Sequence, residues 1–246
     1  MGNERLRSQM QSAGITVGDL ATEVDVDPKT VQRWLDVGRV PHQRHRQRTA
    51  AVLDSEEEYL WPELLDDPRR LSASQAEVLS LYPHRGAVPG DLWSRLLDQA
   101  TECVDLLAYS GLFLLDSQPT FLERLIAKAR TGLRTRVLLG DPEAPVLSER
   151  GREEGIGEQM GVRAQLSIDV TRAARNQADF DVRTHATPLY NSIYRFDDQA
   201  LVNLHAYGWQ APQNPVLHLQ RIPGGQLFDH YLTSFDRVWE TGRDVV

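Results

Sequence analysis

The sequence predicts two domains of different class, a small all-α domain followed by a larger α/β or α+β domain. At 246 residues the chain is longer than one small domain requires, and its 41% hydrophobic and 25% charged residues are typical of packed globular domains. Apolar residues recur at helical spacing in the first part, whereas short apolar runs alternate with helical patterns in the second. We expect the domains at residues 1–65 and 81–246, joined by a linker at 66–80.

The first domain is expected to contain four or five short helices. Apolar residues at helical spacing predict a first helix that ends near Gly14 and a later one over Pro41–Leu53. Between them, Leu20–Trp34 holds parts of two helices that meet across a short turn, and Gly38 ends the second. Residues 54–70, which end in Asp-Asp-Pro-Arg-Arg, are expected to form the tail of this domain and the start of the linker.

The helix pair over Leu20–Trp34 is the most informative stretch. Asp27 suits an N-cap and Pro28 the first helical position, while Thr16 and Asp19 form an approximate capping box before the first helix. The residues expected to face inward are apolar: Leu20, Ala21, Val24, Val26, Val31 and Trp34. Those left outward are polar or basic: Lys29, Thr30, Gln32 and Arg33. Such side chains reach phosphates and base edges in a major groove, so we expect this face to bind DNA.

The charge of the chain is divided unevenly. The net charge is −8, but residues 1–53 hold eight basic and six acidic side chains. Within them, Arg39–Arg48 carries four arginines and no acid: Arg39, Arg44, Arg46 and Arg48. We expect these arginines to contact the DNA backbone. The acidic remainder should repel DNA, which leaves the N-terminal face as the route of contact.

The single cysteine and the hydropathy limit where the protein works. Cys103 lies in a strand-like apolar run and is expected to be a buried, reduced thiol. No apolar run approaches the roughly 20 residues that span a bilayer, and the N-terminus lacks the apolar stretch of a signal peptide. The expected location is the cytoplasm.

The second domain shows a strand–helix–strand pattern. Strands are expected at Cys103–Tyr109 and Thr135–Leu139, with a helix at Phe121–Ala129 between them, so the sheet should be partly parallel. A helix around Leu92–Ala100 comes before this unit, and a helical or mixed stretch over residues 145–177 follows it. Further strands are expected at Phe180–Ala186, Ser192–Phe196, Ala200–Tyr207 and Pro215–Ile222, and a closing helix spans Phe228 to Trp239.

In Leu20–Trp34, the small Ala21, the apolar Val24, Val26 and Val31, and the polar outward set resemble the Cro/repressor-type (XRE-like) helix-turn-helix family. That family usually has Gly in the turn where this chain has Asp25, and Asp tolerates the left-handed backbone better than most residues. The resemblance implies sequence-specific DNA binding. The alternative is an αα-hairpin in an ordinary helical domain.

The second domain resembles one half of a phospholipase D-like domain, on the order of its elements, the segment YNSIYRFDDQALVNLHAYG and the closing SFDRVWE. Active members carry His-x-Lys-x4-Asp. Counting back from Asp198 places Asn191 and Ile193 at the His and Lys positions, and counting from Asp197 places Tyr190 and Ser192 there. Because neither register keeps the nucleophile or the lysine, the domain is not expected to be an enzyme. A helix-turn-helix before such a degenerate domain is similar to a group of actinobacterial transcriptional regulators.

A fold built around a phosphate pocket keeps its concavity after losing its nucleophile, so we expect it to sense a small ligand, with a phosphorylated or nucleotide-like metabolite as one class. The candidate ligand-binding residues are His84, Arg85, Asp141, His185, Tyr190, Asn191, Tyr194, Arg195, Asp197, Asn203 and His205. The alternative is that these polar groups satisfy one another. No catalytic residue, cofactor or metal site is expected, because the histidines show no tight ligand spacing.

The sequence therefore predicts a transcriptional regulator that binds a palindromic operator in double-stranded DNA as a homodimer, which pairs through the second domain, and that responds to a small effector. One rival is a nuclease or phosphodiesterase of the phospholipase D superfamily, with His185 or His205 as a displaced nucleophile. Another is a scaffold whose second domain binds only protein.

Overall fold

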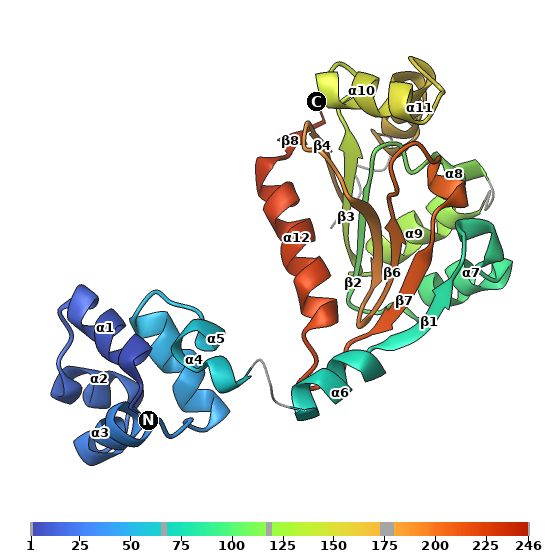
Figure 1. Cartoon of the computed structure of the whole chain (residues 1–246). Coiled ribbons are helices and arrows are strands. Elements are labelled where there is room, and N and C mark those ends of the chain that lie inside the picture. Colours follow the sequence, from blue (N-terminus) through green and yellow to red (C-terminus); the bar gives the residue numbers. More distant parts are fainter. Residues whose placement is uncertain (1, 65–67, 117–119, 173–179, 246) are drawn as a thin grey trace. The chain divides into compact units, whose positions relative to one another are not determined.

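The computed structural model describes residues 2–64, 68–116, 120–172 and 180–245 (Figure 1). The chain divides into two compact units, residues 1–72 and 73–246, which we describe separately. The segment 66–80, expected as a linker, differs from that expectation in its described part. Helix α6 (Pro68–Ala76) and most of strand β1 (Val78–Tyr82) lie there, and β1 pairs with a strand of the second unit's sheet.

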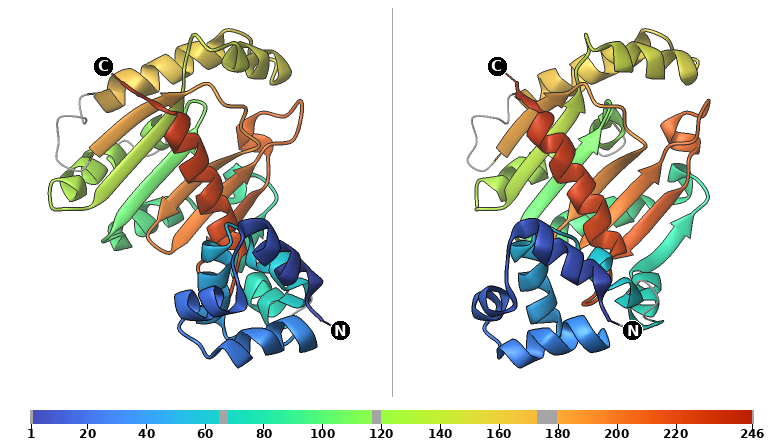
Figure 2. Two further views of the ribbon diagram at one scale, coloured as in Figure 1. Left: turned by 90° about the vertical axis from the view of Figure 1, so that its left-hand side faces the viewer. Right: turned by 60° about the vertical axis from the view of Figure 1, so that its left-hand side comes forward.

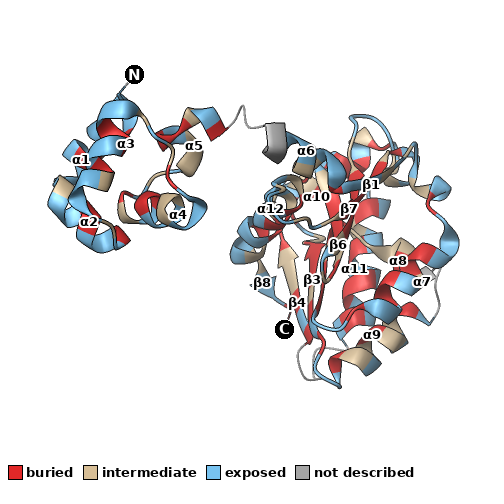
Figure 3. Ribbon diagram, turned by 90° about the horizontal axis from the view of Figure 1, so that it is seen from below, coloured by how far each residue is buried: buried red, intermediate tan, exposed pale blue. Residues whose placement is uncertain are grey.

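The first unit is all helical. It contains α1 (Glu4–Ala13), α2 (Val17–Val24), α3 (Pro28–Val37), α4 (Gln43–Val52), α5 (Glu57–Leu60) and the short 3₁₀ helix η1 (Pro62–Leu64). Figure 3 shows the buried residues of these helices gathered on their inner faces. Trp34 and Trp61 meet edge to face in this core, with ring centroids 6.5 Å apart, and both indoles are almost fully buried. A single apolar core therefore holds the unit together.

Local sequence signals set the helix ends. Gly14 and Gly38 follow α1 and α3 in the left-handed conformation, with φ of 67° at each. The start of α4 differs from expectation: Pro41 precedes the helix, which begins at Gln43 after His42.

The second unit is built on one eight-stranded mixed sheet with the strand order β1-β7-β6-β5-β2-β3-β4-β8. Its strands after β1 are β2 (Cys103–Ala108), β3 (Arg134–Gly140), β4 (Phe180–His185), β5 (Asn191–Phe196), β6 (Gln199–Leu204), β7 (Val216–Gln220) and β8 (Arg243–Asp244). The β2, β3 and β4 strands are parallel, and the other pairs are antiparallel. This confirms the expectation of a mixed sheet combined with helices.

Helices cover both faces of the sheet. The long α12 (Leu227–Thr241) crosses one face, as Figure 2 shows, and α7 (Gly90–Gln99) and α9 (Phe121–Ala129) pack on the other. The remaining helical segments are η2 (Arg85–Ala87), α8 (Leu112–Asp116), α10 (Pro145–Glu153), α11 (Gln159–Arg172) and η3 (Ala211–Gln213). Because side chains alternate along a strand, β2 and β5 contribute to the core on both faces.

The expected strands are present, with differences at the ends. β6 stops at Leu204 rather than reaching Tyr207, because its neighbours β5 and β7 pair with it only as far as that end. The sequence pattern did not reveal β1 or β8. The expected mixed stretch contains α10 and α11 up to Arg172, and its last residues lie outside the described part. Cys103 is buried and free. In the described part of the chain, no helix is both long and apolar enough to cross a membrane.

Candidate functional site

The α2–α3 pair has the geometry that its sequence predicts. Thr16 Oγ1 accepts from the Asp19 amide at 3.2 Å while Asp19 accepts from the Thr16 amide at 3.0 Å, which closes the capping box. Asp27 caps α3 through the Lys29 amide at 2.8 Å. Asp25 adopts the left-handed conformation in the turn, with φ 58° and ψ 55°. The inward set is buried as expected, except that Val26 is only partly buried.

The outward face of α3 is exposed. Lys29, Gln32 and Arg33 are exposed and Thr30 is half-buried. Gln32 donates to Asp36 at 2.8 Å, which leaves its second N–H and its carbonyl oxygen for another partner. A polar groove of about 380 Å³ runs beside α3, and Thr30, Arg33 and Arg39 line it together with His42 and His45. The groove thus brings arginines from α3 and from the loop after it to one concave surface.

The basic segment Arg39–Arg48 splits into two kinds of arginine. Arg39, Arg44 and Arg48 are exposed, and Arg44 lies 3.6 Å from Asp25 in an exposed ion pair. Arg46 is different: its Nε donates to Glu57 at 3.0 Å and its Nη1 donates to the Pro41 carbonyl at 2.9 Å. We therefore correct the expectation that Arg46 contacts DNA, because its guanidinium is held inside the unit and its side chain is mostly buried.

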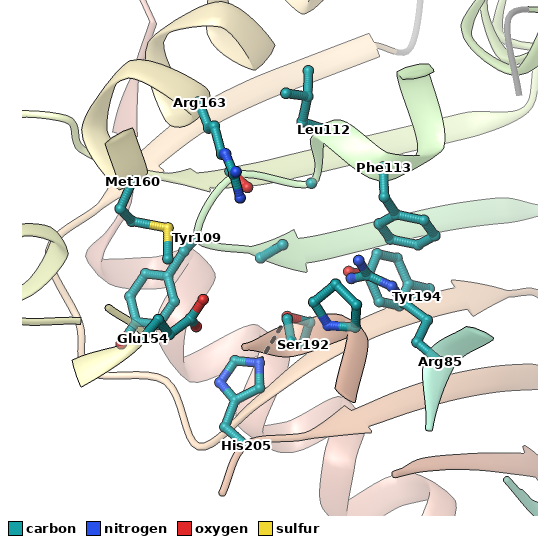
Figure 4. Close-up of a pocket in the computed structure, with 15 residues that line it drawn as sticks. Arg85, Tyr109, Leu112, Phe113, Glu154, Met160, Arg163, Ser192, Tyr194 and His205 are labelled. Carbon is teal, nitrogen blue, oxygen red and sulfur yellow. Dashed lines mark hydrogen bonds between the residues drawn. The ribbon is translucent and has the colours of Figure 1, made fainter. Parts of the chain in front are cut away.

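The second unit contains a cavity of about 280 Å³ at one end of strands β2 and β5 (Figure 4). Three of the expected ligand residues line it: Arg85, Tyr194 and His205. The sequence did not indicate the others, which include Tyr109, Phe113, Glu154, Met160, Arg163 and Ser192. They come from β5, α11 and the segments that follow β2 and α10, so the cavity is assembled by the strand order rather than by one motif.

His205 and Ser192 form a polar pair at the cavity wall. Ser192 Oγ lies 3.2 Å from His205 Nε2, and His205 Nδ1 lies 3.3 Å from the Leu189 carbonyl. Because a carbonyl can only accept, this geometry favours a proton on Nδ1 and a hydroxyl that donates to Nε2. Burial, with smaller contributions from the nearby Arg150 and Arg85, lowers the pKa of His205 to about 4. The imidazole is therefore neutral at pH 7.

Cations outnumber the anions around the cavity. Arg150 pairs with Glu154 at 2.8 Å and with Glu153 at 3.1 Å, so its charge is matched inside the protein. Arg85 lies over the Phe113 ring, 3.9 Å from its centroid, and Arg163 is exposed at the cavity. Among the described residues, no carboxylate lies within 4.0 Å of the guanidinium of either. Burial lowers the pKa of Arg85, opposed by Tyr194 and Glu154.

Two of the expected ligand residues are structural. Asp197 follows β5 at the opposite end from the cavity and accepts from the amides of Thr101, Glu102 and Cys103 at 2.7 to 2.9 Å. Burial would raise its pKa, but these hydrogen bonds outweigh burial and hold the pKa below its usual value. Arg195 lies on the other face of the sheet and donates to the buried Asp105 at 3.0 Å. Both are corrected as ligand contacts.

The remaining expected residues do not line the cavity. Asp141 and His185 line a separate hollow of about 460 Å³ beyond the ends of β3 and β4. His185 is 2% exposed, its Nδ1 accepts from the Thr187 amide at 3.2 Å, and burial lowers its pKa to about 4.

Asn203 is buried and donates to the carbonyls of Asn214 and Pro215 at 3.3 and 3.2 Å. His84 and Tyr190 are exposed and Asn191 is half-buried. Tyr190 to Asn203 therefore do not form one cluster, since adjacent positions face different surroundings.

The described residues contain no group of three or more His, Cys, Asp or Glu side chains placed to hold a metal ion. Of the two positions at which the expected resemblance to phospholipase D would place a His and a Lys, counted from Asp197, Tyr190 is 82% exposed and Ser192 lines the cavity. The arrangement can bind an anion and form hydrogen bonds to it. It offers no imidazole nucleophile with a lysine beside it.

Comparisons with known proteins do not assign a family. No family model matches the chain, and no curated protein matches it. Among solved structures it is similar to TrmBL2, described as an archaeal chromatin protein that shows a novel mode of DNA binding, with 15% sequence identity and a TM-score of 0.42. The match covers 89% of this chain and 72% of that chain. A TM-score at this level carries no functional conclusion for the present chain.

Proposed function

We propose that the protein is a DNA-binding transcriptional regulator of the helix-turn-helix type, and that its second unit is a non-catalytic, phospholipase D-like sensor of a small ligand. The observation that carries the DNA-binding part is the α2–α3 pair with its capped turn and its exposed Lys29, Gln32 and Arg33. Exposed arginines continue from this face along the groove to Arg39. Helix N-termini, arginines and polar side chains are the groups that bind phosphates and base edges.

The charge distribution supports contact through the first unit. Of the basic segment, Arg39, Arg44 and Arg48 are exposed, whereas the chain beyond residue 53 is acidic. An acidic body raises the cost of any DNA contact outside the basic surface. Docking would therefore place α3 in the major groove and the exposed arginines along the backbone.

The test uses a duplex selected from a random pool by the full-length protein. Arg33→Ala and Arg44→Ala should each lower the salt dependence of binding by about one unit in the slope of log K against log salt, because each removes one phosphate contact. Arg152→Ala, which makes the same charge change on the second unit, is the matched control and should leave the slope unchanged. A double variant with Arg33 and Arg44 both replaced that still binds normally would overturn the proposal.

The sensor part rests on the cavity of the second unit. It is concave, and two arginines line it without a carboxylate of the described residues at ion-pair distance. No lysine is among the described residues that line it beside His205. A ligand that binds there more tightly in one arrangement of the protein than in another would change operator affinity. The change can be at most the ratio of the ligand's affinities for the two arrangements. Protein binding at the second unit is the other outcome, and a thermal-shift screen that finds no small-molecule ligand would favour it.

One observation favours an enzyme as the second candidate: the Ser192–His205 pair, oriented by the Leu189 carbonyl. A hydroxyl beside an imidazole is the arrangement of many covalent catalysts. However, the pKa of His205 is lowered to about 4, so it would be a weak base. Turnover of a generic phosphodiester that disappears in His205→Ala would establish the enzyme, and a rate equal to the buffer blank would exclude it for that substrate.

A further inference from the structure

A second, smaller space of different chemistry borders the cavity of the second unit. This space is a cleft of about 30 Å³ that shares four lining residues with the cavity, Ala108, Ser110, Gly111 and Tyr194. The other walls of the cleft are mainly apolar and come from α8, α9 and β3: Leu114, Phe121, Leu122, Leu125, Val137 and Leu139. A molecule that occupies both spaces would therefore have one polar end and one apolar end.

The polar end would be an anion. Arg85 is half-buried against Phe113 and Arg163 is exposed, and no carboxylate of the described residues lies within ion-pair distance of either. Glu154 interacts with both guanidinium groups at longer range, but its close ion-pair partner is Arg150 at 2.8 Å. A guanidinium presents paired donors that match the oxygens of a phosphate or a carboxylate.

Helix α11 links the two spaces. Arg163 and Ser167 are four residues apart and so lie on the same side of this helix. Arg163 lines the polar cavity and Ser167 lines the cleft. The Ser167 side chain is 1% exposed, and its Oγ has no hydrogen-bond partner among the described residues. An apolar ligand group offers this hydroxyl no hydrogen bond, so Ser167 marks where α11 borders the cleft and does not itself favour an apolar occupant.

We propose that the cavity binds a small organic anion, with its charged group between Arg85 and Arg163 and a short apolar group in the cleft. This inference rests on the sensor role proposed above and names its ligand class: an alkyl or aryl phosphate, or the corresponding carboxylate. The size of the cleft limits the apolar group to about the volume of one or two water molecules, or two to three carbon atoms.

The length of the ligand's alkyl chain is the sharpest test, because varying it changes the ligand and leaves the protein intact. Titration calorimetry of the full chain would compare inorganic phosphate with methyl, propyl and octyl phosphate, the matching carboxylates, and propanol. Each methylene that enters the cleft should tighten binding about fourfold, up to about propyl. Octyl phosphate should bind no more tightly than propyl phosphate, and propanol should not bind measurably. Equal affinity across the series, or binding of propanol as tight as that of propyl phosphate, would overturn the proposal.

Two variants test the polar end and the apolar end of the site separately. Arg85→Gln should lower the affinity for every anion by about tenfold or more, since it removes a charged partner, and should keep the dependence of affinity on alkyl chain length. Ser167→Val, which adds apolar volume to the cleft, should flatten the chain-length dependence and leave inorganic phosphate unchanged. Arg152→Gln, an exposed arginine outside the cavity, is the control for net charge. If the Val variant does not fold, the ligand series on the unmodified protein still decides.

Failure of this inference can be told apart from failure of the regulator proposal. If the protein binds its selected duplex but none of the anions, the DNA-binding proposal stands and the proposed ligand class is wrong. If the protein binds propyl phosphate with the expected dependence on alkyl chain length but binds no duplex, the ligand class stands and the regulator proposal is wrong. Added propyl phosphate that changes duplex affinity would support both.

Discussion

Arg46 and Arg48 are two residues apart in a segment without acids, yet they meet different surroundings. The guanidinium of Arg46 is held by Glu57 at 3.0 Å and the Pro41 carbonyl, and the side chain is only 15% exposed. Arg48 is exposed. In the sequence the two arginines looked equivalent, because both are basic residues in the same segment. The geometry of the helix turns Arg46 toward α5 and Arg48 toward solvent.

We expect Arg46→Ala to lower the free energy of unfolding of the first unit by about 1–3 kcal/mol, because it leaves a partly buried carboxylate and a carbonyl without their donor. Arg48→Ala should change stability by less than about 0.5 kcal/mol but lower the salt dependence of DNA binding. Urea denaturation and duplex titration at several salt concentrations measure the two effects. Equal stability of both variants would contradict the assigned role of Arg46.

The buried histidines predict an acid-sensitive fold. Burial lowers the pKa of His185 and of His205 to about 4, whereas an imidazole in the unfolded chain titrates near 6.5. Between these values the unfolded state binds more protons than the folded state, so the free energy of unfolding falls as the pH falls through this window. The full contribution is present above about pH 6.5 and is lost by about pH 4.

For His185, which is 2% exposed, this contribution is at most about 3 kcal/mol. Urea denaturation of the wild type and of His185→Gln at pH 7.5 and pH 5 would measure it. The variant, whatever its stability at pH 7.5, should lose less stability on acidification than the wild type. Parallel pH profiles for the two proteins would rule out His185 as a source of the acid sensitivity.

At the scale of elements, the features that depend on neighbouring residues in the chain were predicted correctly from the sequence. The capping box of Thr16 and Asp19, the Asp27 cap and the βαβ unit all depend on residues close together in the chain, and all are present. Strand β1 was missed because it is short and exposed at the sheet edge, which removes the apolar alternation that marks a half-buried strand.

The ligand residues were predicted less well than the elements. Arg85, Tyr194 and His205 line the cavity, but Asp197 and Arg195 serve the fold, and Arg163 and Glu154 were missed. Which side chains converge depends on the strand order and on the placement of α11, and neither is encoded in local spacing. Tyr194 and Arg195 lie on opposite faces of β5, as the alternation of side chains along a strand requires.

The turn of the helix pair gives a prediction at this scale. Asp25 holds a left-handed conformation that most side chains disfavour and glycine adopts freely. We expect Asp25→Gly to be more stable than Asp25→Ala by about 1 kcal/mol, measured by urea denaturation of the full chain. Both variants lose the exposed ion pair to Arg44, so they share that change. An Ala variant as stable as the Gly variant would show that the turn is not strained.

At the scale of the whole molecule, a single recognition helix reads only a few base pairs, so we expect two chains to share one operator. Sedimentation at micromolar concentration should give a mass near twice 27.8 kDa, and the selected duplexes should contain inverted half-sites about one helical turn apart, or a multiple of that. A monomer that binds a site without a repeat would contradict this expectation.

The two edges of the eight-stranded sheet differ, and this difference limits how copies can associate. β1 forms one edge with no charged residue, and Val78, Leu79 and Leu81 are exposed along it. The other edge carries β8, whose Arg243 and Asp244 pair with β4. Unprotected edges are templates for strand pairing, while short charged ones resist it. Association of two copies through the β1 edge would close around a two-fold axis and would block growth into a filament.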